Sequence, residues 1–118
     1  MAVRPGEVIR VWDRQVNPPK FKRLICISSE KQLFLRINSR ALFKPHHLLL
    51  ASESDFLDYD SYVELRQLIR PYAYEIQQAE PLGQLSAKQA MSLISSAHNA
   101  ETLPQEHKDL IAESLAAV

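Results

Sequence analysis

The residue types that make up the chain change near Leu82, and this change constrains the fold more than any other feature. Before Leu82, β-branched and aromatic residues form short apolar runs separated by Pro, Asn, Asp and Ser. After it, Ala, Gln, Glu, Lys and Leu dominate, and the apolar residues are more widely spaced. The first pattern is typical of strands and the second of helices. We therefore expect a mainly β, α+β domain in which a sheet is followed by helices.

The first part of the chain predicts several short strands. The apolar runs at 7–12, 23–28, 33–37 and 48–51 have strand character, whereas 62–65 and 69–74 suit either a strand or one face of a helix. Pro18 and Pro19 cannot donate hydrogen bonds to a sheet and mark a loop. Because a small sheet leaves unpaired edges, we expect residues 1–80 to close into a compact β-barrel.

The last part of the chain, residues 82–118, predicts two helices. Ser86 followed by Gln89 forms a capping box, in which each side chain bonds the backbone N–H of the other residue. Thr102 and Gln105 repeat this spacing, with Pro104 in the first turn, where its missing N–H costs nothing. A chain of 118 residues is the size of one domain, so we expect residues 1–118 to fold as a unit.

Composition argues for a cytoplasmic protein without a metal or another cofactor. The single cysteine, Cys26, excludes an internal disulfide, and no apolar stretch is long enough for a signal peptide or a membrane span. His46 and His47 are adjacent, so on a strand they point to opposite faces and do not jointly hold a metal. We expect no membrane association.

The charges are distributed unevenly along the chain. Residues 1–44 carry 10 Lys/Arg against 3 Asp/Glu, and residues 45–118 carry 4 against 11, so a net charge of zero conceals halves of +7 and −7. A basic half attracts polyanions, which favours a nucleic-acid partner. Alternatively, the two halves neutralise each other on the folded surface. Trp12 and Phe34 could stack on bases, although a strand aromatic is more often part of the core.

The order of these segments resembles the MazF/PemK toxin family. The resemblance rests on the strand-like runs at 6–11, 23–28 and 33–39, on the segment 63–70, and on Leu82-Gly83-Gln84-Leu85-Ser86 before the first helix. It implies a small SH3-like barrel, usually a homodimer. It also implies a metal-independent endoribonuclease that a protein antitoxin inhibits, and it favours strands for the two ambiguous segments.

The resemblance also implies site residues. Lys22 aligns with a family arginine that acts on the scissile phosphate, Arg23 lies beside it, and Ser39 aligns with the family hydroxyl group; we expect these three residues to be catalytic. The residues expected to contact RNA are Arg14, Lys20, Asn38, Arg40 and Lys44.

The residue types fit RNA cleavage by the 2′-hydroxyl. The phosphorane formed in that reaction carries extra negative charge, which fixed cations and hydroxyl donors stabilise without a metal. Lys22 could also act as a general base if burial or neighbouring cations lower its pKa. The loop 17–23 has two prolines and no glycine, unlike the loop of the family. A barrel that binds protein or nucleic acid without cleaving it is therefore the alternative.

Overall fold

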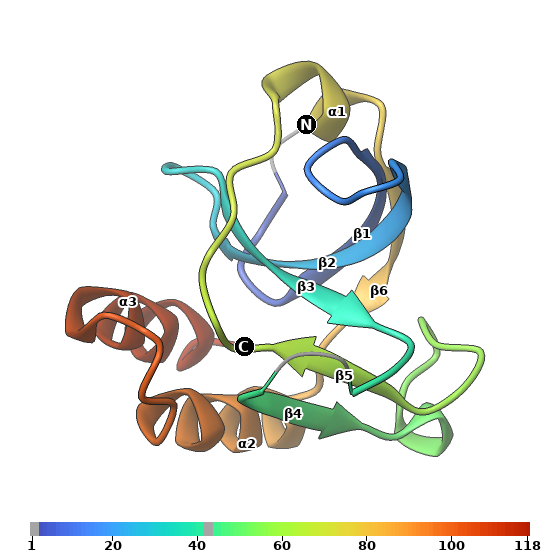
Figure 1. Ribbon diagram of the computed structural model, residues 1–118. Coiled ribbons are helices and arrows are strands. Elements are labelled where there is room, and N and C mark those ends of the chain that lie inside the picture. Colours follow the sequence, from blue (N-terminus) through green and yellow to red (C-terminus); the bar gives the residue numbers. More distant parts are fainter. Residues whose placement is uncertain (1–2, 42–43) are drawn as a thin grey trace.

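The computed structural model describes residues 3–41 and 44–118, and Figure 1 shows one curved antiparallel sheet with helices on both sides. The strands are β1 (Glu7–Asp13), β2 (Lys20–Ser28), β3 (Leu33–Asn38), β4 (His46–Leu49), β5 (Ser61–Glu64) and β6 (Glu80–Gln84). The helices are η1 (Ala51–Glu53, a 3₁₀ turn), α1 (Ala73–Gln77), α2 (Ala87–His98) and α3 (Gln105–Leu115). The mainly β, α+β class with C-terminal helices is confirmed.

The sheet does not close into the expected barrel. Its strand order is β4-β5-β3-β2-β1-β6, so within the described chain β4 and β6 are its two edges. Pro81 lies in the edge strand β6, where it lacks the N–H that would recruit another strand. Because α2 and α3 cover one apolar face of the sheet and the segment around α1 covers the other, burial of these faces does not require closure.

The strand predictions succeed where the strands are apolar and fail elsewhere. The expected runs at 7–12, 23–28 and 33–37 lie in β1, β2 and β3, most of 62–65 lies in β5, and part of 48–51 lies in β4. Residues 69–74 do not form a strand: Ile69 makes one bridge to Phe34, and the helix α1 begins at Ala73. β6 escapes prediction because Pro81 and Gly83, which disfavour strands, occupy two of its five positions.

Each face of the sheet buries its own apolar cluster. α2 and α3 pack on one face, where Ile25, Leu35 and Leu93 are fully buried. The segment around α1 packs on the other face with Ile76 against a smaller cluster that includes Cys26. Burial raises the pKa of the Cys26 thiol to about 12, so this cysteine is an inert core residue. No helix of the described residues is long and apolar enough to cross a membrane.

One of the two expected helix caps forms. The Ser86 hydroxyl accepts a hydrogen bond from the Gln89 backbone N–H at 3.1 Å, and the Gln89 side chain accepts one from the Ser86 N–H at 2.9 Å. The Thr102 cap is wrong: Pro104 occupies the N-cap of α3, and no side chain caps that helix. The Thr102 hydroxyl donates instead to the Leu65 carbonyl at 2.9 Å, which ties the loop before α3 to the end of β5.

The adjacent histidines of β4 point to opposite faces, as expected. The His46 ring packs edge-on against Tyr62, with 5.0 Å between centroids. His47 lies on the other face, where its Nδ1 is 2.6 Å from the Ser96 hydroxyl of α2. Burial lowers the pKa of His47 below its ordinary value of 6.5.

This burial predicts a loss of stability in mild acid. Below about pH 6.5 the unfolded chain takes up a proton at His47 before the folded chain does, so stability falls as the pH falls toward the folded pKa. We expect His47→Gln to reduce the drop in melting temperature between pH 7.5 and pH 5, measured by circular dichroism. The same change at the exposed His98 should leave the drop as it is; equal drops in wild type and His47→Gln would contradict the prediction.

Candidate nucleic-acid interface

The loop end of the β1–β2 hairpin, next to residues 14–19, carries two exposed aromatic side chains. Trp12 and Phe21 are cross-strand partners, so their rings project from the same face. The rings meet edge to face with 5.0 Å between centroids, and the residues are 41% and 51% exposed. The pair lies beyond the part of this face that α2 and α3 cover, which explains why strand aromatics remain on the surface.

Two tyrosines and two arginines extend this aromatic pair. Tyr72 and Tyr74 flank the start of α1 and stack nearly parallel, with 5.8 Å between centroids. The guanidinium carbon of Arg10 lies 3.8 Å from the Phe21 centroid, and that of Arg14 lies 5.9 Å from the Tyr74 centroid. Arginine held over an aromatic ring is attracted by the ring face and keeps hydrogen-bond donors free for an anion.

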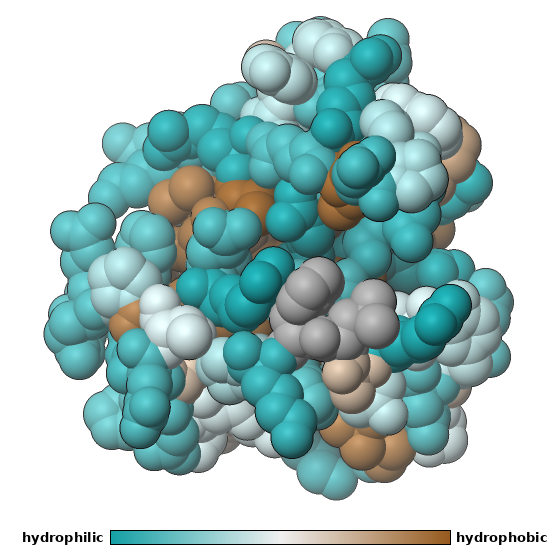
Figure 2. All heavy atoms as spheres, viewed as in Figure 1, coloured by the Kyte–Doolittle hydropathy of each residue, from teal (hydrophilic) through white to brown (hydrophobic). Residues whose placement is uncertain are grey.

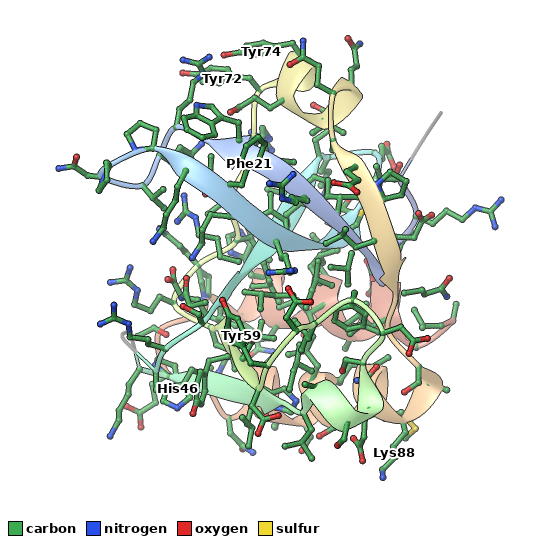
Figure 3. The ribbon with its side chains drawn as sticks, turned by 90° about the vertical axis from the view of Figure 1, so that its right-hand side faces the viewer. Phe21, His46, Tyr59, Tyr72, Tyr74 and Lys88 are labelled. Atoms are coloured by element: carbon green, nitrogen blue, oxygen red, sulfur yellow. The ribbon has the colours of Figure 1, made fainter. Side chains whose placement is uncertain are left out.

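All of these side chains except Tyr72 line a hollow of about 310 Å³. Its lining residues are Arg10, Trp12, Arg14, Phe21, Tyr74, Glu75 and Gln78. Figure 3 shows Phe21, Tyr72 and Tyr74 gathered at one end of the molecule, far from the exposed Tyr59 and Lys88. We call this region the aromatic–arginine surface, and it comprises Trp12, Phe21, Tyr72 and Tyr74 with Arg10 and Arg14.

The opposite face of the same hairpin holds a chain of polar side chains. The ammonium group of Lys22 donates to the Asn38 side-chain oxygen, and the Asn38 amide donates to the Glu64 carboxylate at 3.1 Å. Asn38 and Glu64 are buried, and Lys22 is half-buried. Burial, followed by the nearby charges of Lys20 and Arg36, lowers the pKa of Lys22 from its ordinary value of 10.5.

A buried ion pair supports this second face. The Arg36 Nε donates to an Asp13 carboxylate oxygen at 2.7 Å, and both side chains are more than nine-tenths buried. The Asp13 carboxylate also accepts the Gln15 backbone N–H at 2.9 Å, and the Gln15 side chain accepts from Arg36 at 3.1 Å. The pair therefore fixes the start of the 14–19 loop against β3.

The structure brings together only some of the expected site residues. Lys20, Lys22 and Asn38 belong to one face of the β1–β2–β3 sheet. Arg23 points to the other face, where it donates to Asp58 at 3.0 Å, so it does not share a site with Lys22. Arg14 joins the aromatic–arginine surface. The remaining expected residues, Ser39, Arg40 and Lys44, are exposed in the loop that follows β3.

The surface shows partial mixing of the two charged halves of the sequence. Arg10 and Arg23 pair with Glu80 and Asp58, which come from the acidic half. The face in Figure 2 is largely hydrophilic, with separate hydrophobic patches and no continuous apolar surface. Of the two aromatics considered from the sequence, Phe34 is buried in the core and Trp12 is on the surface.

Sequence reasoning missed Tyr72, Tyr74 and Glu75 as site residues. The segment 69–74 suited either a strand or a helix, and the family resemblance favoured a strand, in which Tyr72 and Tyr74 would simply share a face. The sequence does contain a signal for the other part of the site. Trp12 and Phe21 flank the loop of the predicted hairpin on either side, so the hairpin itself predicts that these two aromatics lie close together.

A larger hollow of about 610 Å³ lies between β1, α1 and the turn before β3. Its walls are mostly apolar, with Ile9, Phe34 and Ile76 among them, and Glu7 is the one charged side chain in its described lining. Because it offers no cation to a phosphate group, it suits a polyanion less than the aromatic–arginine surface does.

Comparison with known proteins adds no assignment. No protein-family model matches this sequence, and no curated protein matches it. The resemblance to the MazF/PemK family therefore stays a prediction.

Proposed function

We propose that the protein binds single-stranded RNA through the aromatic–arginine surface. The observation that carries this proposal is a hollow lined by three exposed aromatic rings and two arginines, with a fourth ring, Tyr72, stacked on Tyr74 beside it. Bases of a single strand stack on such rings, and the guanidinium groups pair with its phosphates. The Arg36–Asp13 pair beneath the hairpin supports the proposal, because it holds β1 and the loop after it in place before RNA arrives.

Trp12→Ala tests this proposal. Loss of one stacking ring costs about 1–3 kcal/mol, which is roughly a 5- to 150-fold increase in Kd. We expect this weakening for an eight-nucleotide uridine RNA labelled with fluorescein, measured by anisotropy.

The chain offers a matched control at Tyr59. This ring is 53% exposed but lies away from the aromatic–arginine surface, so Tyr59→Ala should bind RNA as wild type does. Equal weakening by both changes would show that the surface has no special role. A DNA strand of the same sequence that binds more tightly than the RNA would remove RNA as the ligand.

The Lys22 chain favours a second candidate function, metal-independent RNA cleavage. A lysine with a lowered pKa is neutral more often than an ordinary lysine and can accept a proton. In this reaction the neutral Lys22 amine takes the proton of a 2′-hydroxyl, and the 2′-oxygen bonds to phosphorus. The bond from phosphorus to the 5′-oxygen then breaks, and water protonates the leaving oxygen. The products are a 2′,3′-cyclic phosphate and a 5′-hydroxyl.

Cleavage that persists in the presence of a chelator would support this candidate. Strong sensitivity to the chelator would point to another reaction class. The antitoxin and the homodimer that accompany the family resemblance remain predictions, as does the cytoplasmic location.

A further inference from the structure

Glu75, in the wall of the hollow of the aromatic–arginine surface, has one carboxylate oxygen without a hydrogen-bond partner among the described residues. Glu75 is only 5% exposed, and it lines the hollow together with Tyr74 and Gln78. Its Oε1 accepts the Tyr72 backbone N–H at 2.9 Å. Its Oε2 is buried and has no hydrogen-bond partner in the part of the chain that the structure describes.

An unpaired buried acceptor is costly, and a donor from a ligand would relieve that cost. Burial strengthens such a bond, because competition from water is reduced. The hollow of about 310 Å³ is at the small end of the range of about 300–1,000 Å³ typical of ligand pockets, which suits one planar base. Trp12, Phe21 and Tyr74 supply the aromatic faces against which such a base stacks.

We infer that this hollow is a base-specificity pocket in which Glu75 selects guanine. The inference rests on the proposed binding of single-stranded RNA. The Watson–Crick edge of guanine carries two adjacent donors, N1–H and the 2-amino group, beside the O6 acceptor. A carboxylate matches the two donors, and Arg10, Arg14 and Gln78 lie in the same wall as possible donors to O6.

The other bases fit this wall less well. Adenine and cytosine place a ring-nitrogen acceptor beside their amino group, so that an acceptor faces the carboxylate. Uracil has one N–H between two carbonyl oxygens, and these oxygens repel the Glu75 carboxylate. Discrimination therefore arises from unpaired or repelled groups, the kind of selection that polar pockets perform well.

The test compares eight-nucleotide RNAs that contain one variable base among uridines. We expect wild type to bind the guanine strand about tenfold more tightly than the adenine strand, as measured by anisotropy. Inosine, which lacks the 2-amino group, should bind several-fold more weakly than guanine. Equal Kd values for guanine, inosine and adenine would overturn the inference without any variant.

Glu75→Gln tests the residue itself. Glutamine retains the acceptor that the start of α1 needs, because a capping box accepts Gln as well as Glu at this position. It replaces one carboxylate oxygen with an N–H₂ donor, so the ratio of guanine to adenine binding should fall close to one. Glu106→Gln, at an exposed carboxylate on α3, should keep the full ratio.

The outcomes separate this inference from the proposed function. If wild type binds uridine RNA but shows no guanine preference, or if Glu75→Gln keeps the preference, the guanine pocket is wrong and RNA binding stands. If wild type binds no RNA of any sequence, both proposals fail.

Discussion

Arg36→Met is expected to lower the free energy of unfolding by about 3–5 kcal/mol. The substitution keeps most of the side-chain volume but leaves the buried Asp13 carboxylate without the cation that donates to it. Asp13 would retain only the Gln15 N–H as a charge-stabilising donor from the contacts it makes now. An uncompensated buried charge costs several times more than a broken surface pair. Urea denaturation followed by circular dichroism measures the change.

The same substitution at a surface pair is the control. Arg10 pairs with Glu80 at 3.4 Å, but both side chains are well exposed, so Arg10→Met should cost less than about 1 kcal/mol. The double variant Asp13→Asn/Arg36→Met removes both charges and keeps an acceptor for the Gln15 N–H. It should recover part of the loss, with a coupling of about 1–3 kcal/mol. Equal losses for Arg36→Met and Arg10→Met would mean that burial of the pair has no energetic role.

The sequence predicts the elements of this fold better than their closure. The change in composition at Leu82 correctly separates most of the sheet from α2 and α3. Apolar residues recur every second position in a strand with one buried face and every three to four positions in a helix with one buried stripe. The edge strand β6 has no such period: it pairs with β1 through its backbone, and its side chains are mostly exposed. An edge strand of this kind leaves little trace in sequence, and a barrel expected from strand count alone cannot be told from an open sheet.

The candidate site shows the same division between local and long-range information. Trp12 and Phe21 are nine residues apart, and the hairpin register that pairs them follows from the loop between them. Tyr74 and Glu75 reach the same hollow from a segment more than fifty residues later, which only the tertiary fold brings there. Arg23 is a different case. Strand alternation already separates it from Lys22, and the reasoning that separated His46 from His47 applies to this pair as well.

The β1–β2 hairpin thus presents different chemistry on its two faces. One face carries the aromatic rings and arginines that suit bases and phosphates, and the other carries the Lys22–Asn38–Glu64 chain that suits proton transfer. A strand of RNA that passes around the loop end of the hairpin would contact both. Binding and cleavage are therefore separable by mutation, which makes the role of Lys22 directly testable.

Lys22→Arg is expected to reduce chelator-resistant RNA cleavage by about 10²–10⁴-fold, because a general base contributes about this factor. Arginine preserves the positive charge but stays protonated, so it cannot accept the 2′-hydroxyl proton. Lys22→Met should lose as much activity as Lys22→Arg. In wild type the rate should rise with pH up to the folded pKa of Lys22, which lies below 10.5, since the neutral amine is the active form.

Two readouts distinguish this role from a structural one. The fall should appear in kcat with little change in KM, because the aromatic–arginine surface, which we propose binds RNA, lies on the other face of the hairpin. Lys88→Met removes an exposed charge on α2, far from the hairpin, and should leave the rate unchanged. If Lys22→Arg cleaves RNA as fast as wild type, then Lys22 supplies only positive charge and another group removes the proton.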